Sequence, residues 1–312
     1  MSLILLAGTS NLPLATAIAE CLGAPLAERE VSRFPDGEMH IEVRASVRGC
    51  DVYLLQSTGP PAEEHLIQLL LLADACRRAG AARLTAIVPY LGYARQDRRG
   101  TGREPVGARV AADLFAAGGI ARVVAVDLHT PALEGVFGPP LEHLTAVSLL
   151  SERLRQGSAD PGVIIAPDLG ATKLADRYAR LLRLPVAFVH KQRVTGERVT
   201  VRGLTGDVCD RAPLVVDDMI TTGGTVEAAI HAALEAGCRP AITVAATHGL
   251  FVGRAAERLG ALPVTRVVTT DSVAASTSAI PSLERVSLAP LLADAIARLH
   301  GDRSLSDLIV HA

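Results

Sequence analysis

The chain contains one internal repeat, and its two copies lie about half the chain apart. Residues 76–92 read CRRAGAARLTAIVPYLG and residues 233–249 read ALEAGCRPAITVAATHG. Each copy has the pattern of a helix end, an Ala-Gly pair, a strand and a glycine, and each follows a strand, a turn and a helix. Any two strand–helix units look somewhat alike, but a separation of half the chain favours duplication of one α/β unit.

The duplication predicts two α/β domains. Apolar runs of strand length alternate with helical patterns throughout, which is typical of mainly parallel sheets flanked by helices. A length of 312 residues fits two domains. We predict an N-terminal domain at 1–148 and a C-terminal domain at 149–287. The helical segment 288–310 is assigned to the first domain, with packing on the second as the alternative.

The composition excludes several classes of function. Tryptophan is absent and aromatic residues make up 3%, so the chain lacks the stacking platforms typical of nucleic-acid binding. A formal charge of −2 indicates no polyanion-binding surface. The five cysteines are scattered without a CxxC pair, which predicts free thiols in a reducing compartment. With no signal peptide and no apolar run of about 20 residues, we expect a cytoplasmic protein without membrane or nucleic-acid partners.

The strongest candidate for a binding site is the segment LVVDDMITTGGT at 214–225. Its apolar start predicts the end of a buried strand, directly followed by Asp217 and Asp218, and a helix is expected over 226–236. The turn between them offers backbone N–H groups and hydroxyls to an anion: Thr221, Thr222, Gly223, Gly224 and Thr225. A turn that merely connects two elements is the alternative. Carboxylates suit sugar hydroxyls and the turn suits a phosphate, so we predict a phosphorylated sugar as the ligand.

Two further polar residues follow predicted strands. His129 comes after the strand at 122–126, and Asp168 after the strand at 163–165. Ligands gather at the carboxyl ends of strands in open α/β sheets, although a single histidine is often only structural. Both side chains are candidate Mg²⁺ contacts, and Mg²⁺ takes few protein ligands and keeps water or phosphate oxygens. A polyphosphate would complete such a site, so we expect a nucleotide as the second ligand.

Three clusters of charged or aromatic residues could serve that nucleotide. Lys191 and Arg193 lie two positions apart and project the same way from an extended backbone, where they could neutralise a transferring phosphoryl group. A solvated basic loop is the alternative reading. The second cluster is Arg95, Gln96 and Asp97, followed by Arg98, and its arginines offer donors that match phosphate oxygens. The third offers one ring face and two acceptors to an adenine: Phe34, Asp36, Gly37 and Glu38.

Together these segments resemble the ribose-phosphate pyrophosphokinase family, also called the phosphoribosyl pyrophosphate synthetases. The resemblance extends from Leu3 to about Ala297. Its motifs are RFPDGE at 33–38, PYLGYARQDRR at 89–99, VDLHT at 126–130, APDLGATK at 166–173, HKQR at 190–193, VVDDMITTGGT at 215–225 and ATHGLF at 246–251. The 215–225 motif is shared with phosphoribosyltransferases, whereas RFPDGE, YARQDR and DLH in that order are specific to the synthetases.

The resemblance implies two phosphoribosyltransferase-like domains and a Mg²⁺-dependent reaction of ATP with ribose 5-phosphate. The β,γ-diphosphoryl group would pass to the C1 hydroxyl, giving phosphoribosyl pyrophosphate and AMP. The implied sugar-phosphate contacts are Arg193, Asp217, Asp218 and Thr221 to Thr225. The implied ATP contacts are Phe34, Asp36, Gly37, Glu38, Arg95, Gln96 and Asp97. The implied catalytic pair is Lys191 and Arg193, and the implied Mg²⁺ residues are His129 and Asp168.

In the family the adenine site usually comes from a neighbouring subunit, so the resemblance also implies a homo-oligomer. A dimer is the smallest expected unit and a hexamer a larger option. Three positions depart from the family pattern: many members have Asp at Thr221, Arg at Gln192 and Gly at Ala171. The phosphate activation and ADP inhibition of the main branch are therefore not carried over. Two alternatives stay open, a catalytically silent partner of a true synthetase and a phosphoribosyltransferase.

Overall fold

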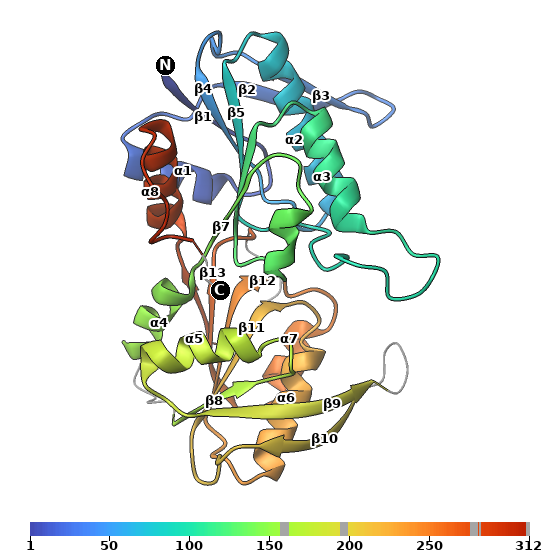
Figure 1. Cartoon of the computed structure of the whole chain (residues 1–312), viewed down its shortest axis with the longest axis vertical. Coiled ribbons are helices and arrows are strands. Elements are labelled where there is room, and N and C mark those ends of the chain that lie inside the picture. Colours follow the sequence, from blue (N-terminus) through green and yellow to red (C-terminus); the bar gives the residue numbers. More distant parts are fainter. Residues whose placement is uncertain (157–161, 194–198, 275–279, 281, 310–312) are drawn as a thin grey trace. The chain divides into compact units, whose positions relative to one another are not determined.

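The computed structural model describes the chain as two compact units, each with its own sheet (Figure 1). Residues 157–161, 194–198, 275–279, 281 and 310–312 are outside the described structure, as are the side chains of 191–202. The first unit comprises residues 1–145, 272–274 and the described part of 287–312. The second comprises residues 146–271 and the described part of 275–286.

The first unit is built on a five-stranded sheet in which every neighbouring pair of strands is parallel. Its strands, in spatial order, are β1 (Leu3–Ala7), β4 (Asp51–Leu55), β5 (Arg83–Val88), β6 (Arg122–Val126) and β7 (Leu141–Leu144). β2 (Arg29–Arg33) and β3 (Met39–Val43) form a separate antiparallel hairpin. Parallel pairing requires long crossovers, which the helices supply.

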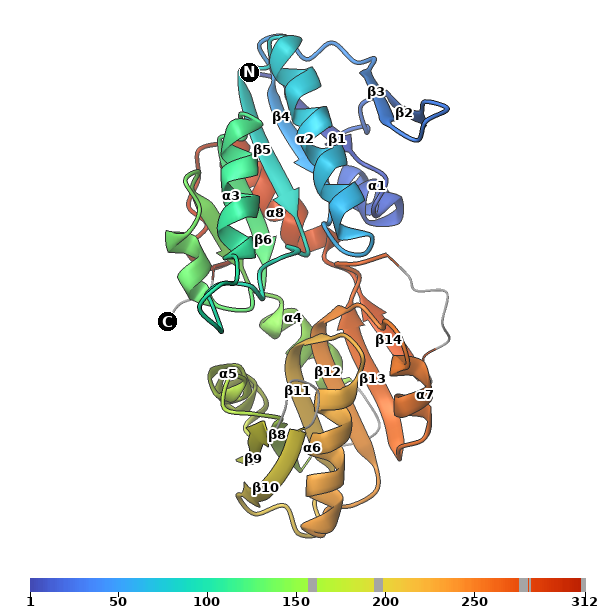
Figure 2. The same ribbon diagram turned by 90° about the vertical axis from the view of Figure 1, so that its right-hand side faces the viewer.

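The helices of this unit cover both faces of the sheet (Figure 2). They are α1 (Leu12–Leu22), α2 (Ala62–Arg78), α3 (Gly107–Ala117), the 3₁₀ turn η1 (Pro131–Gly135) and α8 (Ala289–His300). One face carries a fully buried core in which Leu69 of α2 and Phe115 of α3 pack with Val52 of the sheet. α8 lies on the other face, where the ring of His300 meets Tyr53. Both faces are therefore buried, as a parallel sheet requires.

The second unit has a seven-stranded sheet. Its strands, in spatial order, are β10 (Val199–Thr205), β9 (Val186–Arg193), β8 (Val163–Ala166), β11 (Pro213–Ile220), β12 (Ile242–Gly249), β13 (Val264–Thr270) and β14 (Leu283–Val286). Among the described strand pairs of this sheet, only β9 and β10 are antiparallel. The helices are α4 (Val147–Arg155), α5 (Thr172–Leu182), α6 (Gly224–Glu235) and α7 (Ala255–Gly260). α6 and α7 bury Ile230 and Leu259 against the sheet.

The two units repeat one topology, which confirms the predicted duplicated fold. In each, five parallel strands stand in chain order, and the first strand and helix are followed by an antiparallel hairpin. β1, β4, β5, β6 and β7 therefore correspond to β8, β11, β12, β13 and β14. The hairpin β2–β3 forms its own sheet, whereas β9–β10 extends the sheet of the second unit.

The ends of three elements differ clearly from the sequence predictions. β11 runs through Asp217 and Asp218 to Ile220, because the ladder to β12 continues as far as Gly249. α6 correspondingly begins at Gly224 rather than at 226. The C-terminal helix ends at His300, and turns follow it to Ile309. An apolar run cannot reveal a strand that continues through charged residues, since only pairing with a neighbour holds it extended.

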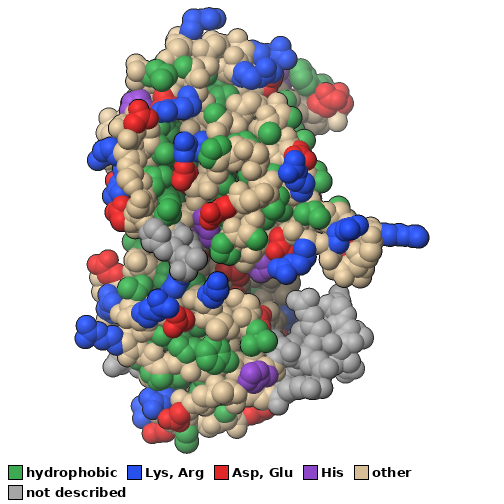
Figure 3. Space-filling model, in the orientation of Figure 1, with side chains coloured by type: hydrophobic (Ala, Val, Ile, Leu, Met, Phe, Trp, Pro, Cys, Tyr) green, Lys and Arg blue, Asp and Glu red, His purple; other side chains and the backbone are tan. Residues whose placement is uncertain are grey.

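The described surface mixes charges of both signs. Acidic and basic side chains are interspersed on the face drawn in Figure 3, without a large area of one sign. No helix in the described residues has the length and hydropathy that crossing a bilayer requires.

Candidate functional site

The acidic pair of the second unit lies inside β11, near its carboxyl end. The Asp217 carboxylate accepts a hydrogen bond from the backbone N–H of Asp218 at 2.9 Å. Burial raises the pKa of Asp217 well above its ordinary value, and the neighbouring charges of Asp218 and Asp168 raise it further. Three carboxylates of like charge in a desolvated place favour a partner that donates hydrogen bonds or carries positive charge. Sugar hydroxyls and divalent cations are such partners.

The small-residue loop leads directly into α6. Gly223 is the N-cap and adopts the left-handed φ of 78°, which explains a glycine at this position. No side chain caps the helix there. The first turn of a helix leaves N–H groups without partners inside the helix, and the helix dipole adds positive potential. The N-terminus of α6 therefore suits a phosphate group.

The back of this loop is held by the segment that follows β12. The carbonyl of Ile220 accepts hydrogen bonds from the N–H groups of Leu250 and Phe251, at 3.0 and 3.1 Å. The carbonyl of Thr221 accepts one from Val252 at 3.0 Å. Carbonyl oxygens would repel an anion, so fixing them against the protein leaves the other side of the loop to the N–H groups.

Asp168 lies in the turn between β8 and α5. Its Oδ1 accepts hydrogen bonds from the N–H groups of Gly170 and Ala171, at 3.0 and 3.2 Å. β8 pairs with β11, and the charge of Asp168 contributes to the raised pKa of Asp217. Asp168 and the acidic pair therefore share one carboxyl edge of the sheet. Among the described residues, no three His, Cys, Asp or Glu side chains are grouped to hold a metal ion.

The predicted catalytic pair lies at the end of β9, the strand next to β8. Lys191 pairs in register with Val201 of β10, and Arg193 with Val199. The side chains of both residues lie outside the described part of the chain. The backbone therefore places Lys191 and Arg193 at the same edge of the sheet as Asp168, since β8 and β9 are parallel.

In the first unit, the predicted adenine residues form the tip of the β2–β3 hairpin. The turn is closed by the N–H of Phe34, which donates to the carbonyl of Glu38 at 2.9 Å, and by Glu38, whose N–H donates to Asp36 at 3.1 Å. Gly37 has a φ of 93°, which a tight turn of this kind requires. Phe34 is 49% exposed, so its side chain is available to a ligand or to another chain.

The other predicted nucleotide residues lie in the loops after β5 and β6. The carbonyl of Gln96 accepts from the N–H of Ala108, and Arg95 is exposed. The hydrogen bond from Arg98 lowers the pKa of Asp97, and the charge of His129 contributes in the same direction. His129 itself is exposed after the β6 strand. The fold thus brings Asp97 and His129 together from different loops.

The first unit has no counterpart of the acidic site. At the equivalent position after β4, Gln56 is buried and donates to the Oε1 of Gln68 at 2.7 Å. These amides also accept from the loop after β1, because Gln68 Oε1 takes the Thr9 N–H and Gln56 Oε1 takes the Ser10 N–H. In the first unit, the amide oxygens of Gln56 and Gln68 therefore accept hydrogen bonds from backbone N–H groups that could otherwise bind an anion.

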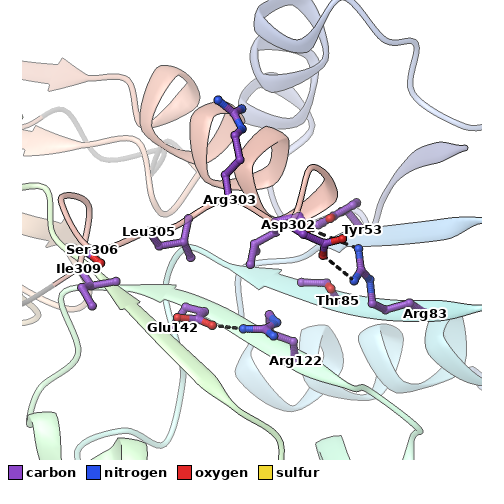
Figure 4. A pocket seen from close by; sticks show the side chains of 11 residues that line it. Tyr53, Arg83, Thr85, Arg122, Glu142, Asp302, Arg303, Leu305, Ser306 and Ile309 are labelled. Atoms are coloured by element: carbon purple, nitrogen blue, oxygen red, sulfur yellow. Dashed lines mark hydrogen bonds and ion pairs between the residues drawn. The ribbon is translucent and has the colours of Figure 1, made fainter. Parts of the chain in front are cut away.

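A cavity of about 380 Å³ lies in the first unit, and none of the predicted site residues lines it (Figure 4). Arg83 and Arg122 reach it from the strands and Ser306 from the C-terminal segment. Arg122 forms an ion pair with Glu142, and Arg83 bonds the buried carboxylate of Asp51. No sequence motif marked this cavity, because its lining residues are scattered along the chain.

Comparisons with known proteins cover nearly the whole chain. A family model described as the N-terminal domain of ribose phosphate pyrophosphokinase matches residues 3–119, and a phosphoribosyl transferase domain model matches residues 142–268. A ribose-phosphate pyrophosphokinase of Caldanaerobacter subterraneus subsp. tengcongensis is 40% identical over 309 residues, 98% of each chain. The Bacillus subtilis enzyme of the same name is 37% identical over 300 residues, 96% of this chain and 94% of the relative.

A solved structure is also similar to this chain over nearly its whole length. The crystal structure of phosphoribosylpyrophosphate synthetase from Mycobacterium smegmatis is similar with a TM-score of 0.91 and 36% identity. The match covers 97% of this chain and 100% of that one. At this identity and coverage, both domains and their order along the chain are shared.

Proposed function

This chain belongs to the ribose-phosphate pyrophosphokinase family, and on that premise we propose which of its residues bind the substrates and carry out the transfer. The chain is a ribose-phosphate diphosphokinase. It joins the C1 oxygen of ribose 5-phosphate to the β-phosphorus of ATP. The bond between the β-phosphorus and the α,β-bridging oxygen breaks, AMP leaves, and the C1 hydroxyl loses its proton.

Ribose 5-phosphate binds at the carboxyl edge of the second sheet. Asp217 and Asp218 accept hydrogen bonds from the ring hydroxyls, and Thr221 to Thr225 surround the 5-phosphate. One observation carries this assignment: the carboxylates lie near the end of a strand that leads through a short loop to a helix N-terminus, where the N-cap Gly223 makes no side-chain cap. Phosphate and hydroxyl groups of one pentose match these two features side by side.

ATP is bound by residues of the first unit. Arg95, Gln96 and Asp97 serve the phosphates and ribose, and Phe34, Asp36, Gly37 and Glu38 receive the adenine. Supporting this, the exposed Phe34 ring and the hairpin carboxylates stand free of the core. A neighbouring copy would complete the adenine site, so we propose a homo-oligomer with a dimer as its smallest unit and a hexamer as a larger option.

Mg²⁺ is the cofactor we propose, with His129 and Asp168 as its protein contacts. The donor chemistry fits, because carboxylate oxygens suit this ion and the Asp97 carboxylate accompanies His129. When bound, Mg²⁺ would neutralise charge on the triphosphate. Lys191 and Arg193 supply positive charge to the diphosphoryl group in the transition state.

These assignments divide the work between a nucleotide domain at 1–148, with 288–310, and a sugar-phosphate domain at 149–287. We also propose a cytoplasmic location. Its support is that all five cysteines are free thiols, which fits a reducing compartment.

The decisive experiment mixes the purified protein with ATP, Mg²⁺ and ribose 5-phosphate and follows AMP. We expect AMP to form in equal amount to the ribose 5-phosphate consumed. ATP binding without AMP release would favour a silent partner. Release of pyrophosphate from phosphoribosyl pyrophosphate that requires a nucleobase would favour a phosphoribosyltransferase. Repeating the assay with and without inorganic phosphate defines the regulatory class.

A further inference from the structure

We propose that Arg258 is a positioning residue for the loop Thr221–Thr225, an inference that rests on the proposed phosphate-binding function of that loop. Arg258 lies in α7, well beyond the loop in sequence, and no motif of the sequence marked it. Its guanidinium holds the rear of the loop, and the phosphate would bind on the opposite side.

The contacts of Arg258 are specific. Its Nη1 donates to the carbonyl of Thr222 at 3.3 Å. Its Nε lies 3.4 Å from Oε2 of Glu227, in the first turn of α6. The backbone of Arg258 is anchored by its own helix, because its neighbours Ala255 and Leu259 are 0% and 1% exposed and pack in the core. One side chain thus connects α7 to both the loop and the helix that follows it.

Because the peptide group is planar, the hydrogen bond from Arg258 to the Thr222 carbonyl also sets the direction of the next N–H group. In a planar trans peptide the C=O and the next N–H point in opposite directions. Since Arg258 holds the Thr222 carbonyl, the N–H of Gly223 is directed away from Arg258. The carbonyls of Ile220 and Thr221 are held in the same way by the backbone at 250–252. With the contact from Arg258, three consecutive carbonyls of the loop are fixed against the protein. The N–H groups of the same three peptides, those of Thr221, Thr222 and Gly223, then face the side where the ligand would bind.

The two glycines of the loop lie close to the side chain of Arg258. A Cβ on Gly224 would lie 2.7 Å from Nη1 of Arg258, and one on Gly223 would lie 3.9 Å from the Cβ of Arg258. The guanidinium therefore occupies the space that a side chain at 224 would need. Arg258 also offsets the negative charge of Glu227, which would otherwise oppose a phosphate at the helix N-terminus.

The main test compares Arg258→Gln with Arg254→Gln, because Arg254 is a surface arginine of the same segment whose guanidinium pairs with Glu257. Losing a charged hydrogen bond that orders the loop should raise KM for ribose 5-phosphate about 10-fold, with kcat and KM for ATP changed less than about 2-fold. Arg258→Lys should recover part of the loss. Equal KM values for both glutamine variants, or a fall in kcat alone, would overturn the positioning role.

Two further variants separate this inference from the function of the loop itself. Gly224→Ala should displace the guanidinium and raise KM for ribose 5-phosphate, while the side chain of Arg258 remains intact. Thr225→Val tests the loop directly. If Thr225→Val raises this KM and Arg258→Gln does not, the loop assignment stands and the role of Arg258 is wrong. If neither changes it, the loop assignment is wrong and the role of Arg258 falls with it.

Discussion

The backbone N–H of Asp218 donates a hydrogen bond to the side chain of Asp217 at 2.9 Å. The two neighbouring acidic residues of β11 are thus linked directly, and the bond fixes the carboxylate of Asp217 against the backbone. This bond stabilises the ionised form of Asp217, but burial and the nearby charges of Asp218 and Asp168 outweigh it and raise the pKa. Repulsion among these carboxylates is therefore strongest when the site holds no ligand and all three are ionised. A ligand that donates hydrogen bonds relieves that repulsion on binding.

Asp217→Asn should stabilise the ligand-free protein while weakening its affinity for ribose 5-phosphate. A carboxyl group with a raised pKa in the folded state favours folding below its ordinary pKa, and this contribution is lost as pH rises through the raised value. At about pH 8 the substitution should raise the free energy of unfolding by about 1 kcal/mol, and less at about pH 5. Urea unfolding at both values measures this.

The matched control is Asp210→Asn, at an exposed carboxylate whose pKa is lowered by its hydrogen bonds to Arg239. Exposed pairs of this kind contribute little to stability. If Asp217→Asn destabilises the ligand-free protein at about pH 8, the repulsion inferred for the acidic site is wrong.

Lys191→Ala should lower kcat on the order of 100- to 1000-fold, because one cation is lost from the developing charge of the diphosphoryl group. Lys173 is the only other lysine of the chain and is exposed on α5, so Lys173→Ala is the natural control. AMP release under saturating substrates gives kcat for both variants. Unchanged turnover in Lys191→Ala would remove this side chain from the mechanism.

Asp51→Asn should destabilise the first unit. The fully buried carboxylate of Asp51 accepts from Arg83 Nε at 2.8 Å, from Tyr53 at 3.0 Å and from His300 at 2.9 Å. Burial would raise the pKa of Asp51, but these hydrogen bonds together lower it. Its stabilisation is therefore present above the ordinary pKa and lost as pH falls through the lowered one.

The expected loss for Asp51→Asn is about 3 kcal/mol at neutral pH, since the partner arginine is left without its charge partner. Chemical denaturation measures it. The double variant Asp51→Asn, Arg83→Met should lose less than the sum of the two single losses. Additive losses would show that the two side chains do not act as a pair.

The cysteines should differ sharply in reactivity. Cys21 and Cys209 are exposed, whereas burial raises the pKa of Cys76 to about 12 and also raises that of Cys238. The thiolate is the reactive form, so a thiol reagent at neutral pH should label the exposed pair quickly and the buried pair only after unfolding. Mass spectrometry of labelled peptides identifies the sites. Rapid labelling of Cys76 in the folded protein would contradict the described core.

Much of the site could be predicted from local patterns. The strand–turn–helix at 214–225 was recognisable because apolar runs, glycines and acidic residues lie next to one another in sequence. The end of β11 was not, since Asp217 and Asp218 are polar and are kept extended only by their ladder to β12. Likewise, the sequence separates Asp97 from His129, and the fold brings their charges together.

By itself, the sequence determined the duplicated α/β architecture and the family, and it supplied the segments that we propose to carry the chemistry, because strand and helix periods and turn residues are local signals. Only the tertiary structure decided that Arg258 holds the rear of the Thr221–Thr225 loop, and that Asp51 joins β5 to α8 through Arg83 and His300. These partners are distant along the chain, and packing of the cores, rather than any local pattern, sets which of them meet.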